Sequence, residues 1–152
     1  LTGIKNRSAF DEDIKDKVTN FNRYPSVYLM YLDLNYFKMI NDNYGHDTGD
    51  KALILFGKTL HNEAEAMNAD AFRLGGDEFG VIFCHHTKKE IDEFIKRVSE
   101  KVSNNDFKFN FSFSVGTAKY AKGMSVTDLL NAADKEMYEH KRIVEANLKL
   151  EK

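Results

Sequence analysis

The chain is poor in the residues that mark several protein classes, since it has one cysteine, one proline and no tryptophan. The single Cys84 cannot form an internal disulfide, and its place in a predicted strand suggests a buried apolar filler. A chain without disulfides suits a reducing compartment. We therefore expect a cytoplasmic protein, or the cytoplasmic domain of a membrane-bound sensor. No apolar run approaches the ~20 residues of a membrane span, so we expect no direct membrane contact by this domain.

The chain also lacks an excess of either charge, with a formal net charge of −2 and both signs interspersed. A nucleic-acid-binding surface would show clustered lysine and arginine, so we do not expect a nucleic-acid partner. The 152 residues fit a single domain over 1–152. Because the first residue is Leu1 rather than a methionine, we expect this domain to belong to a longer signalling protein.

Apolar residues at helical spacing predict five helices, and alternating or short apolar runs predict four strands. Strands separated by helices around one hairpin fit an α/β sandwich of the βαββαβ type. The predicted elements are, in chain order, a helix capped by Ser8 and ending near Phe21, a strand over 27–33, a short helix within 34–44, a loop over 45–50, a helix to Met67, hairpin strands over 71–74 and 79–84, a helix from Thr87 to 103, a strand within 107–120 ending near Gly116, and a helix from Ser125 toward Leu150.

The centre of the chain carries a predicted hairpin tip at Gly75-Gly76. Tight turns of this kind need positive φ, which glycine adopts readily. Asp77 and Glu78 follow at the point where the turn re-enters a strand. Taken alone, this acidic tip is most simply a solvated turn. Adjacent strand residues point to opposite faces, so the two acids are not expected to share one role.

Asp33 closes the first predicted strand, and Asp77 follows the hairpin turn. In a βαββαβ sheet these two positions can be spatial neighbours. Two carboxylates with a backbone carbonyl nearby form a hard-oxygen site suited to Mg²⁺. Two metal ions bridging such carboxylates can activate an attacking hydroxyl and stabilise a leaving phosphate. On these residues alone, the alternative is a pair of unrelated surface aspartates.

Residues near this predicted metal site suit a nucleotide. The helix expected to begin around Asn35–Phe37 offers free backbone N–H groups to a triphosphate. Lys38 and Lys141 would add positive charge, and the alternative for each is a solvated helix position. Asn41 and Asp50 together match the donors and acceptors on the edge of guanine. Their alternatives are a polar helix surface and a first-turn acid favoured by the helix dipole.

Six segments resemble, in order, the motifs of GGDEF domains, the diguanylate cyclases. The resemblance covers nearly the whole chain and implies a ferredoxin-like, palm-type sheet with flanking helices, similar to nucleotidyl cyclases. The segments are Leu1–Arg7, Asp33–Asp42, Gly45–Asp50, Arg73–Phe79, Ser114–Gly116 and Ala133–Lys141.

The family joins two GTP molecules into cyclic di-GMP and releases pyrophosphate, so the resemblance implies this reaction here. Asp33, Asp77 and Glu78 would be the catalytic residues. Asp33 and Asp77 would bind two Mg²⁺ ions per site, or Mn²⁺ in their place, with help from the Leu34 carbonyl. Glu78 would support either the metal site or the attacking 3′-OH, and the sequence leaves both roles open.

The resemblance also implies the substrate contacts. Asn41 and Asp50 would recognise guanine. The backbone near Tyr36 and Phe37 would hold phosphates, as would Lys141 together with Lys38. Gly75 and Gly76 would let the triphosphate lie close to the backbone. Each subunit would hold one GTP, so the reaction would need a transient homodimer and an attached sensory or dimerisation domain.

Three departures from the family pattern stand out. Asn35 stands where the family often has a second aspartate. Lys141 is followed by Arg142–Glu145, without the family's arginine in register. No arginine lies within 63–70, so we expect no product-inhibition site there. These departures leave two alternatives open: a GGDEF domain that binds GTP without catalysis and acts as a regulatory or interaction module, and a scaffold without nucleotide.

Overall fold

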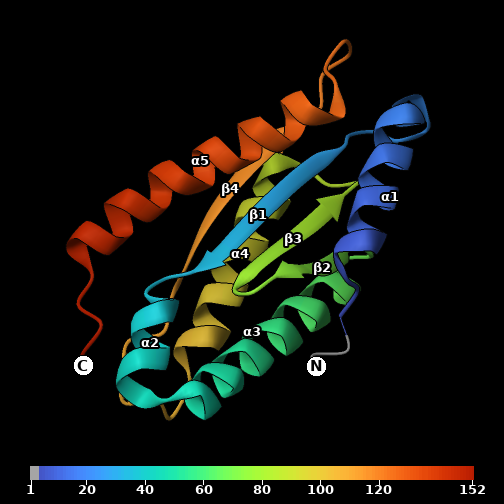
Figure 1. Ribbon diagram of the computed structural model, residues 1–152. Helices are drawn as coiled ribbons and strands as arrows, with labels where there is room; N and C mark the ends of the chain where they lie inside the picture. The colour runs from blue at the N-terminus through green and yellow to red at the C-terminus, as the bar shows by residue number, and fades with distance from the viewer. Residues whose placement is uncertain (1–3) are drawn as a thin grey trace.

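A four-stranded sheet forms the centre of the protein, and each neighbouring pair of strands is antiparallel. The computed structural model describes residues 4–152, so the first three residues of the motif Leu1–Arg7 lie outside the described residues. The strands are ordered β2-β3-β1-β4, which confirms the predicted βαββαβ arrangement (Figure 1). Their bounds are β1 Tyr28–Leu34, β2 Asp70–Gly75, β3 Glu78–Phe83 and β4 Phe113–Lys119.

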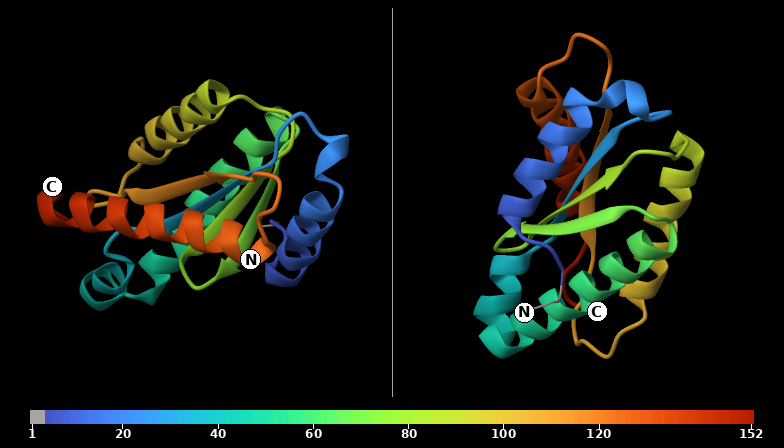
Figure 2. Two further views of the ribbon diagram at one scale, coloured as in Figure 1. Left: turned by 90° about the horizontal axis from the view of Figure 1, so that it is seen from above. Right: turned by 90° about the vertical axis from the view of Figure 1, so that its right-hand side faces the viewer.

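Helices cover both faces of this sheet. Seen along the sheet, α3 and α4 lie on one side, and α1 and α5 lie on the other (Figure 2). Because both faces are covered, the central strand β1 reads as a continuous apolar run rather than as an alternation. The helices are α1 Arg7–Thr19, the 3-10 turn η1 Phe21–Arg23, α2 Phe37–Tyr44, α3 His46–Ala66, α4 Lys88–Ser103 and α5 Val126–Asn147.

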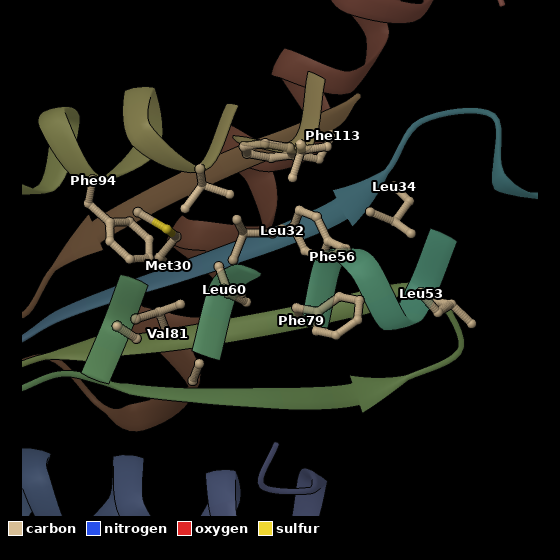
Figure 3. Packing of buried hydrophobic residues seen from close by; sticks show 14 of the residues in the cluster. Met30, Leu32, Leu34, Leu53, Phe56, Leu60, Phe79, Val81, Phe94 and Phe113 are labelled. Atoms are coloured by element: carbon tan, nitrogen blue, oxygen red, sulfur yellow. The ribbon is translucent and has the colours of Figure 1, made fainter. Parts of the chain in front are cut away.

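The larger part of the core lies between the sheet and the pair α3 and α4. Met30, Leu32 and Leu34 point from β1 to this side, as their spacing of two residues requires (Figure 3). Phe56 of α3 packs edge-on against Phe79 of β3, with ring centroids 4.9 Å apart. This packing fixes the β1 and β3 ends that carry the acidic residues.

The opposite face of the sheet is packed more closely by α5. Gly116 of β4 makes this approach possible, because a Cβ atom there would lie 2.1 Å from the backbone nitrogen of Met137. Ala133, one turn earlier in α5, is fully buried against the same strand region. The glycine therefore sets the distance between α5 and the sheet, and with it the reach of side chains near the end of α5.

The outer edge of β4 is closed by side chains of α5. The backbone N–H of Val115 donates to His140 Nδ1 at 3.0 Å, and the N–H of Thr117 donates to Glu136 Oε1 at 3.1 Å. These two residues are two apart, so both N–H groups point away from β1. Because Nδ1 accepts, the neutral His140 ring carries its proton on Nε2.

Two predicted boundaries in the first half of the chain are wrong. The cap of α1 is Asn6, whose side chain accepts a hydrogen bond from the Ala9 N–H, rather than Ser8. The predicted loop over 45–50 is helical, since α3 begins at His46. Gly45 alone turns the chain between α2 and α3 with a φ of 91°, so no longer connection is needed.

The last predicted strand begins later than its alternation suggests and ends at Lys119 rather than near Gly116. Phe109 is fully buried, but only Phe113–Lys119 joins the sheet. Phe109 instead forms an isolated bridge with Glu151, and the Asn110 N–H donates to the Leu150 carbonyl at 2.7 Å. The tail after α5 therefore supplies a partner that an alternating pattern cannot reveal.

The predicted starts of the last two helices and the predicted burial of Cys84 are confirmed. Thr87 and Ser125 cap α4 and α5, and the side chain of each accepts a backbone hydrogen bond in the first turn. Cys84 is buried just after β3, and burial raises the pKa of its thiol to about 11. In the part of the chain that the structure describes, no helix combines the length and apolar character needed to cross a bilayer.

Candidate active site

The structure brings Asp33 and Asp77 together at one end of the sheet. Asp33, near the end of β1, lies opposite Glu78, the first residue of β3. Asp77 occupies the turn just before it, and its carbonyl accepts a hydrogen bond from the Leu34 N–H at 3.3 Å. We call Asp33 and Asp77 the carboxylate end of the site.

The Asp33 carboxyl lies in unfavourable surroundings for a negative charge. Its side chain is only 14% exposed. Burial raises the pKa of Asp33 to about 7, and the hydrogen bond to Asp77 and the Asp77 charge add to the rise, while Lys141 opposes it. Oδ1 of Asp33 is buried and accepts no hydrogen bond. A divalent cation would relieve all of these penalties, so the carboxylate end fits Mg²⁺ chemically.

The cation fit depends on oxygens from few residues. Across residues 4–152, no group of three or more His, Cys, Asp or Glu side chains forms a ready-made metal cluster. The oxygens near Asp33 are those of Asp77 and the Leu34 carbonyl. A metal here would therefore keep open positions for water or phosphate, as Mg²⁺ commonly does.

Glu78 is exposed and lies on the same face of the sheet as Asp33, because the two residues are paired in register. It lines a cavity of about 280 Å³ together with Arg7, Tyr31 and Asp134. Asp33 and Asp77 do not line this cavity. Glu78 is thus near the carboxylate end but faces the cavity lined by residues of α1 and α5.

The hairpin turn has the backbone that its glycines suggest. Gly75 and Gly76 have φ values of 144° and 51°, and a Cβ at either position would meet no atom within 4 Å. The Arg73 guanidinium donates to the Gly76 carbonyl through Nε at 3.1 Å and Nη2 at 2.8 Å. Arg73 was not among the predicted site residues, although its position before the glycines is the signal for this brace.

The chain after β1 turns sharply into α2. Tyr36 has a left-handed φ of 58° and stands at the N-cap, so its backbone N–H is not used by the helix. Lys141 of α5 reaches the same place, with Nζ 3.1 Å from the Leu34 carbonyl and 3.5 Å from Asp33 Oδ2. Phe37 is half-buried at the start of α2, whereas Lys38 is exposed.

Glu145, which was not predicted, completes this region. Its Oε2 accepts the Tyr36 N–H at 3.0 Å and lies 3.3 Å from Lys141 Nζ. The Tyr36 hydroxyl donates to the Glu145 carbonyl and also approaches the Leu148 carbonyl at 3.2 Å. We call Tyr36, Lys141 and Glu145 the phosphate end of the site.

Asn41 of α2 and Asp50 of α3 lie on either side of the junction between these two helices. A Cβ added to Gly49 would lie 1.8 Å from Asn41 Oδ1, so the Asn41 side chain rests directly on the first turn of α3. Asp50 is the next residue and is exposed. The fold therefore places the Asn41 amide against the turn of α3 that also carries Asp50.

Asn35 has a structural role in this arrangement. It is 1% exposed, its Nδ2 donates to Ser112 Oγ at 2.8 Å, and its Oδ1 accepts from Ser114 Oγ at 2.6 Å. A neutral amide can satisfy both hydroxyls, which an ionised carboxylate could do only as an acceptor. Asn35 ties the end of β1 to Ser114 of β4 and to the segment that enters this strand.

Comparison with known proteins places this geometry in a family. The family model described as "Diguanylate cyclase, GGDEF domain" matches residues 1–146. The chain belongs to the GGDEF domain family. The resemblance found in its motifs is thereby confirmed, and the sheet with its flanking helices is the fold of this family.

Relatives of this GGDEF domain carry more than one function in their names. The chain is 34% identical over 145 residues to "Diguanylate cyclase DgcS" of Shewanella oneidensis, covering 93% of this chain and 48% of that protein. It is 32% identical over 143 residues to "Cyclic di-GMP phosphodiesterase PdeB" of the same organism, covering 88% of this chain and 16% of that protein. The chain thus spans about half the length of these relatives or less.

A solved structure shows the same architecture. The coiled coil and GGDEF domain of DgcB from Caulobacter crescentus, in complex with c-di-GMP, superimposes with a TM-score of 0.85 at 26% identity. The match covers 93% of this chain and 78% of that one. The GGDEF fold is therefore shared well beyond the local motifs.

Proposed function

We propose that this GGDEF domain is a Mg²⁺-dependent diguanylate cyclase that converts two GTP molecules into cyclic di-GMP and two pyrophosphates. The observation that supports it is the adjacency of Asp33 and Asp77, with the Asp33 side chain largely buried, its pKa raised and its Oδ1 without a hydrogen-bond partner. A retained pair of this kind is costly for a purely structural domain. Cyclase relatives such as DgcS support the same reaction class.

In this proposal the carboxylate end and the Leu34 carbonyl would hold the metal, which would polarise the α-phosphate and offset the negative charge that develops on the leaving pyrophosphate. Lys141 and the Tyr36 N–H hold phosphate oxygens, and the open turn at Gly75 and Gly76 leaves room for them. Asn41 and Asp50 select guanine through its hydrogen-bonding edge. These residues come from β1, the β2–β3 hairpin, α2, α3 and α5, so only the folded domain assembles them.

The reaction joins the 3′-oxygen of one GTP to the α-phosphorus of the other. The bond from that phosphorus to the bridging oxygen of pyrophosphate breaks, and the hydroxyl proton is lost. Glu78 is exposed near the carboxylate end and either accepts this proton or supports the metal site. A second identical step closes the ring. One site per chain requires two copies, and a two-fold product suits a two-fold homodimer held by an attached domain.

The proposal is tested by product analysis on a forced dimer. The domain is fused to a two-stranded coiled coil, its dimeric state is verified, and it is incubated with GTP and MgCl₂ before the nucleotides are separated. We expect cyclic di-GMP and pyrophosphate in a ratio of one to two. A folded dimer that yields no cyclic di-GMP would overturn the proposal.

One observation favours a second candidate function, a domain that binds GTP without turnover and acts as a regulatory module. Glu145 lies on Lys141 and the Tyr36 N–H, the two groups proposed to hold phosphate. The relative PdeB, named for cyclic di-GMP breakdown, shows that a matching region also occurs outside proteins named as cyclases. Measurable GTP affinity without product in the same dimer assay would support this candidate.

A further inference from the structure

The phosphate end contains its own negative charge at the place where an anionic ligand is proposed to bind. Glu145 Oε2 accepts the Tyr36 backbone N–H at 3.0 Å and pairs with Lys141 Nζ at 3.3 Å. A backbone N–H and an ammonium are also the two donors that the proposed function assigns to phosphate oxygens. The carboxylate therefore uses the same donors that a phosphate group would use.

Lys141 contacts the carboxylate end in the corresponding way, by occupying oxygens proposed for the metal. Its Nζ lies 3.1 Å from the Leu34 carbonyl oxygen and 3.5 Å from Asp33 Oδ2. These are two of the oxygens proposed to bind Mg²⁺. In the free domain the ammonium thus lies against the oxygens that a divalent cation would contact in the nucleotide-bound domain.

Helix physics does not explain why Glu145 stands at this position. In an i, i+4 ion pair the favourable order places the acid before the base, and here Lys141 precedes Glu145. Glu145 also lies in the last turn of α5, where the helix dipole disfavours a negative charge and no basic residue is present. Its benefit comes from outside the helix, through the Tyr36 N–H and the ammonium.

Glu145 is held loosely enough to leave. Its side chain is 29% exposed, so it can turn into solvent without opening the core. Its backbone is anchored separately, because the Tyr36 hydroxyl donates to the Glu145 carbonyl. The carboxylate can therefore be displaced while the end of α5 keeps its place.

We propose that the Lys141–Glu145 ion pair is a built-in substitute for the metal–phosphate pair of a bound nucleotide, and that Glu145 lowers nucleotide affinity by competing for the phosphate position. This inference rests on the proposed function, because that function assigns Tyr36 and Lys141 to phosphate. Binding of a triphosphate requires Glu145 to swing away and Lys141 to move from the Leu34 carbonyl toward the ligand. Glu145 is thus a determinant of affinity and not a catalytic residue.

The test compares Glu145→Gln with Glu139→Gln. The glutamine keeps the size of the side chain and can still accept the Tyr36 N–H, but it removes the charge. Glu139 lies on the exposed face of the same helix and provides the matched loss of one charge. Each variant and the wild-type domain are titrated calorimetrically, in MgCl₂, with inorganic triphosphate, with a GTP analogue carrying an α,β-methylene bridge, and with guanosine.

We expect Glu145→Gln to bind inorganic triphosphate and the GTP analogue roughly tenfold more tightly than wild type, as removal of one nearby like charge at intermediate dielectric implies. Guanosine affinity should not change, and Glu139→Gln should match wild type for all three ligands. Glu145→Arg, which replaces the acid with a bidentate phosphate donor, should increase affinity further. Thermal unfolding of each variant verifies folding.

Each contrary result has a distinct meaning. Equal triphosphate affinity in wild type and Glu145→Gln would overturn the inference and leave the proposed function intact. Tighter binding of guanosine by Glu145→Gln would also overturn it, because competition for phosphate cannot affect a ligand without phosphate. Absence of GTP-analogue binding in wild type and in every variant would overturn both the inference and the proposed function.

Discussion

The two ends of the site differ in what holds them. The carboxylate end is fixed by backbone pairing, since Asp33 lies opposite Glu78 and the Leu34 N–H donates to the Asp77 carbonyl. The phosphate end depends on side chains of α5 that reach across to Tyr36. Main-chain pairing tolerates little displacement, whereas long side chains on one helix can rearrange. We therefore expect the carboxylate end to be preformed and the phosphate end to change on ligand binding.

The largest expected effect comes from removing a carboxylate from the preformed end. Asp77→Asn should lower the rate of cyclic di-GMP formation by about a thousandfold, because one metal-binding charge is lost where reaction charge develops. Because Asp77 is a half-buried turn residue outside the core, the free energy of unfolding should be unchanged or increased. Asp106→Asn, in the exposed loop after α4, is the matched control and should retain full activity. Retained turnover in Asp77→Asn would show that the carboxylate end is not the metal site.

Gly116→Ala should disturb the phosphate end but not the carboxylate end, because it moves α5. The new Cβ would lie 2.1 Å from the Met137 nitrogen, which is backbone and cannot rotate away, so we expect a loss of about 3 kcal/mol of unfolding free energy. The folded remainder should lose triphosphate affinity. Gly80→Ala on β3 is the control, since its Cβ would meet the Phe10 ring at 3.2 Å and should cost less. Urea unfolding of both variants checks the difference, and equal stability would contradict it.

A pH dependence should mark the carboxylate end alone. The pKa of Asp33 is raised from 3.8 to about 7, so the folded state holds a proton that the unfolded state releases between these values. The stability from this proton is fully present below pH 4 and lost as pH rises through 7. The free energy of unfolding of Asp33→Asn, relative to wild type, should therefore rise by about 2 kcal/mol from pH 5 to pH 8 in the absence of metal.

Urea unfolding in EDTA at both pH values measures this gain. Saturating MgCl₂ should shrink the gain, because a cation binds and stabilises the wild-type carboxylate. Asp106→Asn, which removes an exposed aspartate outside the site, is again the control. If Asp33→Asn differs from wild type by the same unfolding free energy at both pH values, the Asp33 proton is not the cause.

The smallest expected effect concerns guanine recognition and leaves both the carboxylate end and the phosphate end intact. Gly49→Ala would place a Cβ 1.8 Å from Asn41 Oδ1 and so displace that side chain. Affinity for the methylene-bridged GTP analogue should fall about fivefold, as expected for one misplaced hydrogen bond of about 1 kcal/mol. Inorganic triphosphate should bind as in wild type. Asn41→Ala should reproduce the loss, and a normal analogue affinity in both variants would exclude Asn41 from guanine recognition.

The difference between the ends also explains what the sequence could predict. Asp33 and Asp77 follow strand-like runs and a Gly75-Gly76 turn, which are local signals, so their meeting was predicted from the order of elements. Glu145 is an unremarkable helix residue in sequence, and its contact with Tyr36 spans 109 positions. Its role depends on the left-handed turn at Tyr36 and on how closely α5 lies on β4, neither of which has a local signal.

Boundaries went wrong for the same reason. The polar residues of 45–50 are typical of a loop, yet Gly45 completes the turn and α3 begins directly after it. The alternating phenylalanines before β4 are typical of a strand, yet Phe109 pairs with Glu151 of the tail. In both cases the backbone has a partner that the local sequence pattern does not reveal.

The closed edge of β4 has a consequence for assembly. An exposed edge strand has unpaired N–H groups that can pair with a strand of another chain. Two copies of a protein can join in this way into one continuous sheet. Here His140 and Glu136 already occupy the outward N–H groups of Val115 and Thr117. Two copies therefore cannot extend each other's sheet through β4 without first breaking these contacts. Any contact between copies at this edge would therefore begin between side chains rather than between backbones.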